Sequence, residues 1–144
     1  MSMLQTSTFN SVILYMSKKV FTIKIDKKLI GVKELMDWAH VRHVPVVNDK
    51  DEVVGMVSHR DLLAASVSSI GDRISDFDRT QQLRTIPLEA VMHSPVTTIS
   101  PTDSIQDAAR LMRGRKIGCL PVVDKGKLIG ILTDYDLLKI VEEM

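Results

Sequence analysis

The sequence of 144 residues has little of several things that define protein classes by themselves. Its one cysteine excludes an intrachain disulfide and favours a reducing compartment. No apolar run approaches the roughly 18 residues that a membrane helix requires. Residues 1–10 lack the basic and apolar blocks of a secretory signal. The composition therefore predicts a cytoplasmic protein without a membrane partner.

Net charge and aromatic content are low as well. The chain carries 19 basic and 18 acidic residues, so its net charge of +1 creates no global field for nucleic acid or an anionic membrane. Aromatic residues make up 4%, which disfavours a stacking platform for single-stranded nucleic acid. There is no Walker loop, no G-x-G-x-x-G and no nucleophile elbow. We therefore expect neither an enzyme nor a nucleic-acid-binding protein, and any anion must bind in a local pocket.

What the sequence does contain is an internal repeat. At a constant shift, Met16 aligns with Met92, Val20 with Val96, Thr22-Ile23 with Thr98-Ile99, Leu35-Met36 with Leu111-Met112, and Pro45-Val46-Val47 with Pro121-Val122-Val123. After one extra residue in a turn of the first copy, Gly55 aligns with Gly130, and Asp61-Leu62-Leu63 with Asp136-Leu137-Leu138. Conserved order and spacing over most of each half indicate a duplicated unit.

Each copy has the same predicted order of elements, β-α-β-β-α. The predicted strands are Val20–Ile23, Val44–Val47 and Val53–Val57 in the first copy, and Val96–Ile99, Leu120–Val123 and Leu128–Leu132 in the second. A helix follows the first strand of each copy, and a last helix begins after Ser58 or Thr133, which are suitable N-cap residues. The pattern predicts an α/β fold in which the two copies pack their sheets together as a pseudo-two-fold pair.

The first helix of each copy differs in its predicted start. In the second copy, Ser104 and Asp107 have the spacing of a capping box, with Asp in place of the usual Glu or Gln. The first copy lacks a good cap, and Gly31 inside its helix costs about 1 kcal/mol.

The stretch between the copies is polar and contains Gly71-Asp72-Arg73 and Asp76-Phe77-Asp78-Arg79. We interpret residues 66–87 as a linker with a helical turn, too short and too polar for a third domain. The predicted organisation is a first repeat at 12–65, the linker at 66–87, and a second repeat at 88–143.

Several segments resemble the repeat of cystathionine-β-synthase-type (CBS) domains. In the first copy they are Tyr15-Met16, Thr22-Ile23, Val44-Pro45-Val46-Val47 and Gly55-Met56-Val57-Ser58-His59-Arg60-Asp61. In the second copy they are Val91-Met92, Thr98-Ile99, Leu120-Pro121-Val122-Val123-Asp124 and Gly130-Ile131-Leu132-Thr133-Asp134-Tyr135-Asp136. Together the copies look like a CBS pair, or Bateman module, covering about residues 12–143. The resemblance implies up to two clefts between the repeats that bind AMP, ADP, ATP, NAD or S-adenosylmethionine. It also implies a homodimer that regulates a partner protein, with no required cofactor.

The segment from Gly55 to Asp61 carries the predicted ribose site. Gly55 permits close backbone approach by a flat ligand, and Asp61 can accept two hydrogen bonds from a ribose diol. The start of the helix favours a nearby phosphate. The structural alternative is that Ser58 caps this helix while Asp61 complements its dipole.

Basic residues distinguish the two copies. The first has Arg42-His43 before its central strand and His59-Arg60 beside Asp61, and the resemblance implies that such basic residues reach phosphates. The second has Gly118-Cys119 and Asp134-Tyr135 at these places, with only Arg115-Lys116 nearby to compensate. We therefore predict that the Asp61 site is the stronger one; the alternative is that these basic residues form a solvated surface.

The adenine is expected between apolar walls with backbone groups at its edge, although the wall residues are as compatible with core packing. The residues predicted to line the two sites are Thr22, Ile23, Arg42, His43, Val44, Pro45, Ser58, His59, Arg60 and Asp61 in the first copy, and Thr98, Ile99, Lys116, Cys119, Leu120, Pro121, Thr133 and Asp136 in the second.

Other candidate sites carry less weight. His40 and His43 have a spacing that could hold zinc on one helix, but Pro45 predicts that the helix ends between them. His93 is predicted to be a surface residue, Cys119 a small buried hydrophobe, and Trp38 part of the core or of a dimer surface. No metal site is expected.

Two functions remain. The first is a stand-alone sensor that binds an adenosine-type ligand and passes its state to a partner. The second is a ligand-independent dimeric scaffold for protein interaction. The sequence names neither the ligand nor the partner.

Overall fold

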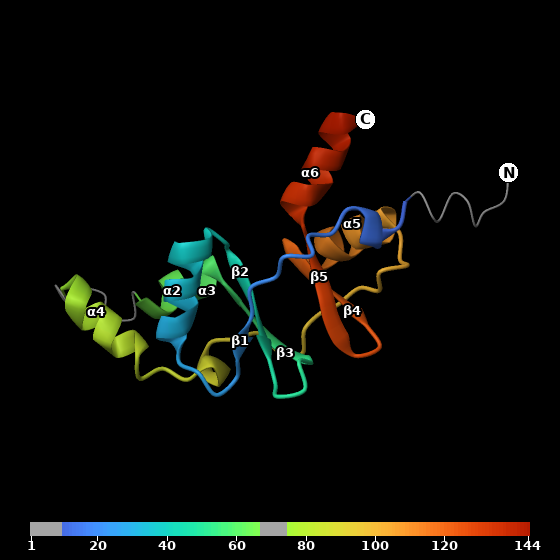
Figure 1. Ribbon diagram of the computed structural model, residues 1–144. Coiled ribbons are helices and arrows are strands. Elements are labelled where there is room, and N and C mark those ends of the chain that lie inside the picture. Colours follow the sequence, from blue (N-terminus) through green and yellow to red (C-terminus); the bar gives the residue numbers. More distant parts are fainter. Residues whose placement is uncertain (1–9, 67–74) are drawn as a thin grey trace, which may run out of the picture. The chain divides into compact units, whose positions relative to one another are not determined.

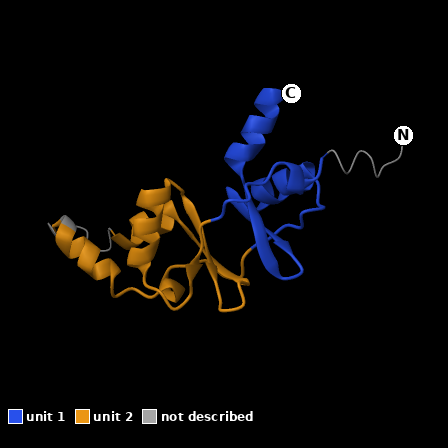
Figure 2. Cartoon of the chain, in the orientation of Figure 1, with its two compact units in different colours: residues 1–20, 97–144 blue, residues 21–96 orange. Residues whose placement is uncertain are grey.

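The computed structural model describes residues 10–66 and 75–144 (Figure 1). The predicted Gly71-Asp72-Arg73 segment of the linker lies outside these residues. The chain forms two compact units, unit 1 from residues 1–20 and 97–144 and unit 2 from residues 21–96 (Figure 2). Each unit therefore combines the sheet of one repeat with the segment that precedes the first strand of the other repeat. The compact units are not contiguous in sequence, whereas the predicted repeats are.

Unit 2 is built on a three-stranded sheet in the order β1 (Ile23–Lys24), β2 (His43–Val47), β3 (Val53–Ser58). β1 runs parallel to β2, and β3 runs antiparallel to it with His43 opposite Ser58. The helices of this unit are α2 (Leu29–Ala39), α3 (His59–Ser66) and α4 (Asp76–Leu83), followed by the 3-10 turn η2 (Leu88–Ala90). The beginnings of β1 and β2, the end of β3 and the start of α3 consequently meet at one end of the sheet.

The core of unit 2 collects apolar residues from every one of these elements: Ile23, Leu29, Val32, Met36, Val44, Val46, Val57, Leu62, Leu83 and Leu88. Leu83 belongs to α4, in the stretch interpreted from the sequence as a linker. That stretch contains a helix of eight residues, longer than the predicted single turn, and its buried leucine anchors it to unit 2.

Unit 1 repeats the arrangement with a two-stranded sheet in place of the three-stranded one. It contains the 3-10 turn η1 (Val12–Leu14), helix α5 (Ile105–Arg115), the antiparallel pair β4 (Cys119–Asp124) and β5 (Lys127–Thr133), and helix α6 (Asp134–Glu143). Its core consists of Val12, Ile99, Ala108, Met112, Leu120, Val122 and Leu132. Figure 1 shows α6 extending away from the strands, and none of its residues is buried.

The first strand of each repeat differs from the prediction. In the first copy the strand begins at Ile23 and not at Val20. In the second copy the predicted strand Val96–Ile99 is reduced to a single bridge between Ile99 and Val122. The parallel register places Thr22 beside Pro45, and Pro121 lies at the matching place. Because proline has no N–H to donate, the ladder cannot extend past these positions.

The helix starts agree with the sequence interpretation in part. The Ser104 hydroxyl accepts from the Asp107 N–H at 3.0 Å, so Ser104 is the N-cap, whereas α2 has no side-chain cap. The predicted capping box is not completed, because Oδ1 of Asp107 accepts from Nη1 of Arg110 at 2.9 Å. α2 ends at Ala39, with His40 in the left-handed region at φ 57°, so His40 and His43 do not share a helix. Gly31 has a packing role that the sequence did not reveal: a Cβ there would lie 2.8 Å from Cδ1 of Ile23. Among the described residues, none of the helices combines the length and apolar character needed to cross a membrane.

Candidate functional site

Asp61 lies at the junction of β3 and α3, where it completes a reciprocal capping box. Its Oδ2 accepts from the Ser58 N–H at 2.8 Å, and the Ser58 hydroxyl accepts from the Asp61 N–H at 3.1 Å. This is the structural role that the sequence offered as the alternative to ligand binding. It leaves the carboxylate with unused acceptor positions, because each ionised oxygen can accept two hydrogen bonds.

A third group, His93, contacts Asp61. Its Nε2 lies 2.8 Å from Oδ1 of Asp61, with side-chain exposures of 72% for the histidine and 16% for the aspartate. His93 is exposed as predicted, but the sequence did not indicate this contact. The two residues lie 32 positions apart. The only signal in the sequence was that His93 aligns with Ser17, so the two copies carry side chains of different length at this position.

The Asp61 carboxyl is held in its ionised form. Burial alone would raise the pKa of Asp61, but the hydrogen bonds from the Ser58 N–H, the His93 side chain and the Ser58 hydroxyl together lower it from its ordinary value. Asp61 is therefore a pure hydrogen-bond acceptor near neutral pH, as the binding of a sugar hydroxyl pair requires.

Unit 1 has the same device at the junction of β5 and α6. Oδ2 of Asp136 accepts from the Thr133 N–H at 2.8 Å, and the Thr133 hydroxyl accepts from the Asp136 N–H at 3.3 Å. The position that matches His93 is Ser17, whose hydroxyl donates to the Lys19 carbonyl at 3.4 Å. Within the described residues, Oδ1 of Asp136 has no hydrogen-bond partner.

The glycine shared by the two repeats has a different role from the one predicted for Gly55. We expected Gly55 to admit a flat ligand, but the space of its missing side chain is filled by Met92, whose Sδ and Cγ would collide with a Cβ. At Gly130 the space of the missing side chain is filled in the same way by Met16. Both methionines belong to the segment that each unit takes from the other repeat, so the glycines admit a neighbouring side chain to the sheet.

Basic residues gather at the Asp61 end of unit 2. Arg42 immediately precedes β2, and its carbonyl accepts from the His59 N–H at 2.7 Å, which fixes the two basic pairs next to each other. Arg42, His59 and Arg60 are exposed and form no ion pair with the described residues. His43 is half-buried at the start of β2. This end of unit 2 can therefore attract an anion.

The matching end of unit 1 is acidic. The Asp134 N–H donates to the Gly118 carbonyl at 2.9 Å, and a Cβ on Gly118 would lie 2.9 Å from Oδ2 of Asp134. Cys119 is buried, and burial raises its pKa to about 12, with the charges of Asp134 and Asp136 adding to the effect. The thiol is thus the small neutral hydrophobe that the sequence predicted. The predicted cations here, Arg115 and Lys116, are exposed at the end of α5.

The predicted adenine walls fall into two groups. Val44, Pro45, Leu120 and Pro121 are buried within their units, with Val44 and Leu120 in the two core clusters, so only their backbone groups can face a ligand. Ile23 and Ile99 are also core residues. Thr22 and Thr98 are exposed beside them.

A surface hollow, Trp38 and the candidate metal ligands lie apart from the predicted nucleotide sites. A hollow of about 530 Å³ in unit 2 is lined by Ile23, Asp26, Lys27, Lys28, Ile30, Gly31 and Arg84, and it shares only Ile23 with the predicted site. It follows the end of β1, opposite the end that holds Asp61. Trp38 is 74% exposed, so it is not a core residue, and its ring meets Phe21 edge-on with centroids 5.7 Å apart. No group of three metal-ligating side chains occurs among the residues described.

Comparison with known proteins places these features in a family. The family model described as CBS domain matches residues 11–68 and 88–143. A CBS domain-containing protein of Dictyostelium discoideum is 34% identical over 127 residues, which are 88% of this chain and 87% of that protein. Other curated relatives are longer, some of them named as enzymes, and the chain spans 22–45% of their length, so those names largely describe sequence outside the match.

Solved structures agree. The crystal structure of AcuB from Vibrio cholerae, a protein proposed to act in acetoin utilization, is 37% identical with a TM-score of 0.75, covering 92% of this chain and 90% of that one. CBSX2 in complex with AMP is 31% identical with a TM-score of 0.76, covering 94% of this chain and 98% of that one. Two family matches in tandem and neighbours of the same extent show that this chain is a CBS domain pair, a member of the CBS domain family.

Proposed function

We propose that this CBS pair is a regulatory module that binds an adenosine-type ligand and transmits its state to a partner protein. The observation that carries the proposal is the half-buried aspartate side chain at the last strand–helix junction of each repeat. After completing its capping box, this carboxylate keeps acceptor positions for a ribose diol. The similarity to CBSX2, a structure with AMP, supports the same ligand class.

The geometry also supports unequal sites. The phosphate of a nucleotide bound at Asp61 would meet the exposed guanidinium groups of Arg42 and Arg60, which can form paired hydrogen bonds to phosphate oxygens. At Asp136 it would meet the carboxylate of Asp134, and Coulomb repulsion would weaken binding. We therefore propose Asp61 as the stronger nucleotide site.

Isothermal titration with AMP, ADP, ATP, NAD and S-adenosylmethionine tests the proposal. The Asp61→Asn variant keeps an oxygen for the Ser58 N–H and removes the charge, so it should weaken ligand binding without unfolding the unit. Asp136→Asn is the matched control and should have the smaller effect. Equal losses in the two variants would contradict the asymmetry, and titration of the wild type without binding of any of these ligands would contradict the proposed function.

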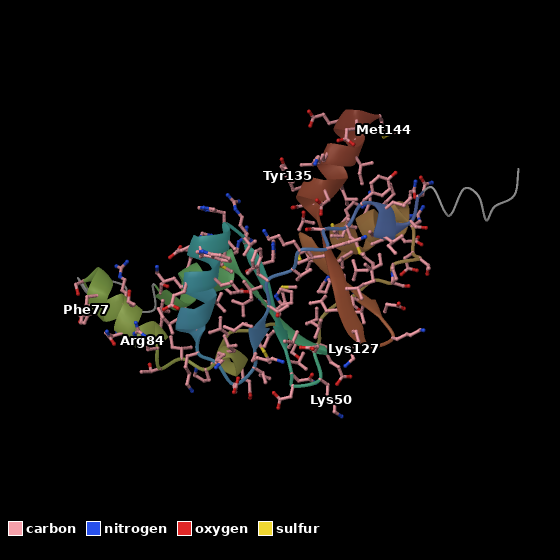
Figure 3. The ribbon with its side chains drawn as sticks, in the orientation of Figure 1. Lys50, Phe77, Arg84, Lys127, Tyr135 and Met144 are labelled. Atoms are coloured by element: carbon pink, nitrogen blue, oxygen red, sulfur yellow. The ribbon has the colours of Figure 1, made fainter. Side chains whose placement is uncertain are left out.

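A ligand-independent dimeric scaffold is the second candidate, and helix α6 favours it. Tyr135, Leu138 and Val141 are exposed at helical spacing on α6 (Figure 3 labels Tyr135 and Met144), and Leu63 of α3 is exposed at the position that matches Leu138. Apolar residues at this spacing form a stripe that another helix can cover. We propose that a second copy of the chain covers this stripe in either function. A dimer that binds none of the five ligands and co-purifies with a partner would favour the scaffold.

A further inference from the structure

We propose that His93 competes with the ligand for Asp61: its imidazole holds Oδ1 in the empty site and must leave that oxygen when a ribose diol binds. The inference rests on the proposed function, because it assumes that Asp61 receives the diol. It adds a residue outside the family's strand–helix motif to the site and predicts a property that distinguishes the two repeats. His93 acts here as a positioning residue that sets the affinity of the carboxylate.

His93 lies where a ribose diol would approach the Asp61 carboxylate. Ser58 already occupies Oδ2 from the protein side at 2.8 Å, and the aspartate side chain is 16% exposed. The group that meets its other oxygen is the imidazole of His93, which is 72% exposed and therefore lies on the solvent side of the pair. A ribose that approaches from solvent meets this hydrogen bond first. Breaking it costs little, because solvent-exposed pairs of this kind are weak.

The imidazole can leave without disturbing the fold. His93 is anchored by its backbone, which exchanges two hydrogen bonds with Met56 of β3 at 2.9 and 3.0 Å. Rotation about the side-chain bonds can therefore release Oδ1 while the backbone bridge persists.

Unit 1 provides an internal control. Ser17 makes the same backbone bridge, with Ile131, at 2.8 and 2.9 Å. Its short side chain does not reach Asp136, whose Oδ1 remains without a partner among the described residues. The two repeats therefore present the same carboxylate with and without a competing side chain.

Isothermal titration of AMP against 2′,3′-dideoxyadenosine monophosphate isolates the effect, because the two ligands differ only in the diol. The His93→Ser variant, which copies the residue of unit 1, should bind AMP about three- to fivefold more tightly than the wild type, the gain expected when an exposed pair no longer has to be broken. Its affinity for the dideoxy ligand should not change. Ser17→His in an Asp61→Asn background should weaken AMP binding at Asp136.

NMR of the ring nitrogens gives a second readout. In the wild type, saturating AMP should shift the Nε2 resonance of His93 to the position that it has in Asp61→Asn. The competition would be overturned by unchanged or weaker AMP binding in His93→Ser, or by an Nε2 resonance that does not move when AMP binds. In either case, loss of AMP binding in Asp61→Asn would still support the proposed function. A wild type that binds AMP at neither site would overturn both.

Discussion

Replacing Asp61 by alanine tests how much the capping box contributes to unit 2. The substitution removes the acceptor for the Ser58 N–H and the partner of His93. Loss of a cap costs about 1 kcal/mol, and an exposed pair adds up to about 1 kcal/mol. We therefore expect Asp61→Ala to lower the free energy of unfolding by about 1–2 kcal/mol, which corresponds to a fall in Tm of about 3–6 °C for a chain of this size.

Asp136→Ala is the matched control. Its Oδ2 has the same capping role, but its Oδ1 has no partner among the described residues, so the expected loss is about 1 kcal/mol. Urea unfolding followed by circular dichroism gives both free energies, and amide hydrogen exchange in the first turn of α3 or α6 shows where protection is lost. Equal unfolding free energies for Asp61→Ala and the wild type at pH 7 would refute the reasoning.

The effect should also depend on pH in a defined direction. The pKa of Asp61 is lowered in the folded protein from its ordinary value of 3.8. Its stabilisation is therefore fully present above about pH 4 and is lost as the pH falls through the lower, folded-state value. The difference between Asp61→Ala and the wild type should shrink below pH 4. A difference that stays constant to pH 2 would show that the carboxylate charge is not involved.

Three further predictions follow from packing and burial. Gly55→Ala should destabilise the protein by about 1–3 kcal/mol because its Cβ would displace Met92, whereas Gly114→Ala, in open space on α5, should stabilise it by about 0.5–1 kcal/mol; urea unfolding measures both. Native Cys119 should react with an alkylating reagent at pH 8 at least about 100-fold more slowly than free cysteine, since so little of it is thiolate, and urea should remove the difference; fast native labelling would contradict its burial. Leu138→Glu should convert the proposed dimer to a monomer in light scattering, with Glu142→Ala as a control on the same helix, and an unchanged mass would exclude this face.

The sequence predicted the element order of both repeats, the termini of the second and third strand of each repeat to within one residue, and the caps at Ser58, Ser104 and Thr133. These features depend on neighbours in the chain: apolar periodicity, turn residues and N-cap chemistry act over a few positions. The first strands were the exception. Their length depends on the parallel partner, in which Pro45 and Pro121 end the ladder, and this pairing is not a local property.

The sequence by itself determined that the chain contains two copies of one repeat and that each copy carries an aspartate after its last strand. Both can be read from the sequence because the two copies keep the same residues in the same order and spacing. Only the tertiary structure decided what meets those residues. Met92 fills the space at Gly55, and His93 reaches Asp61 from 32 positions away. The physical reason is that each unit closes its sheet with a segment taken from the other repeat. The resulting contacts join residues whose separation in the chain has no periodic signature.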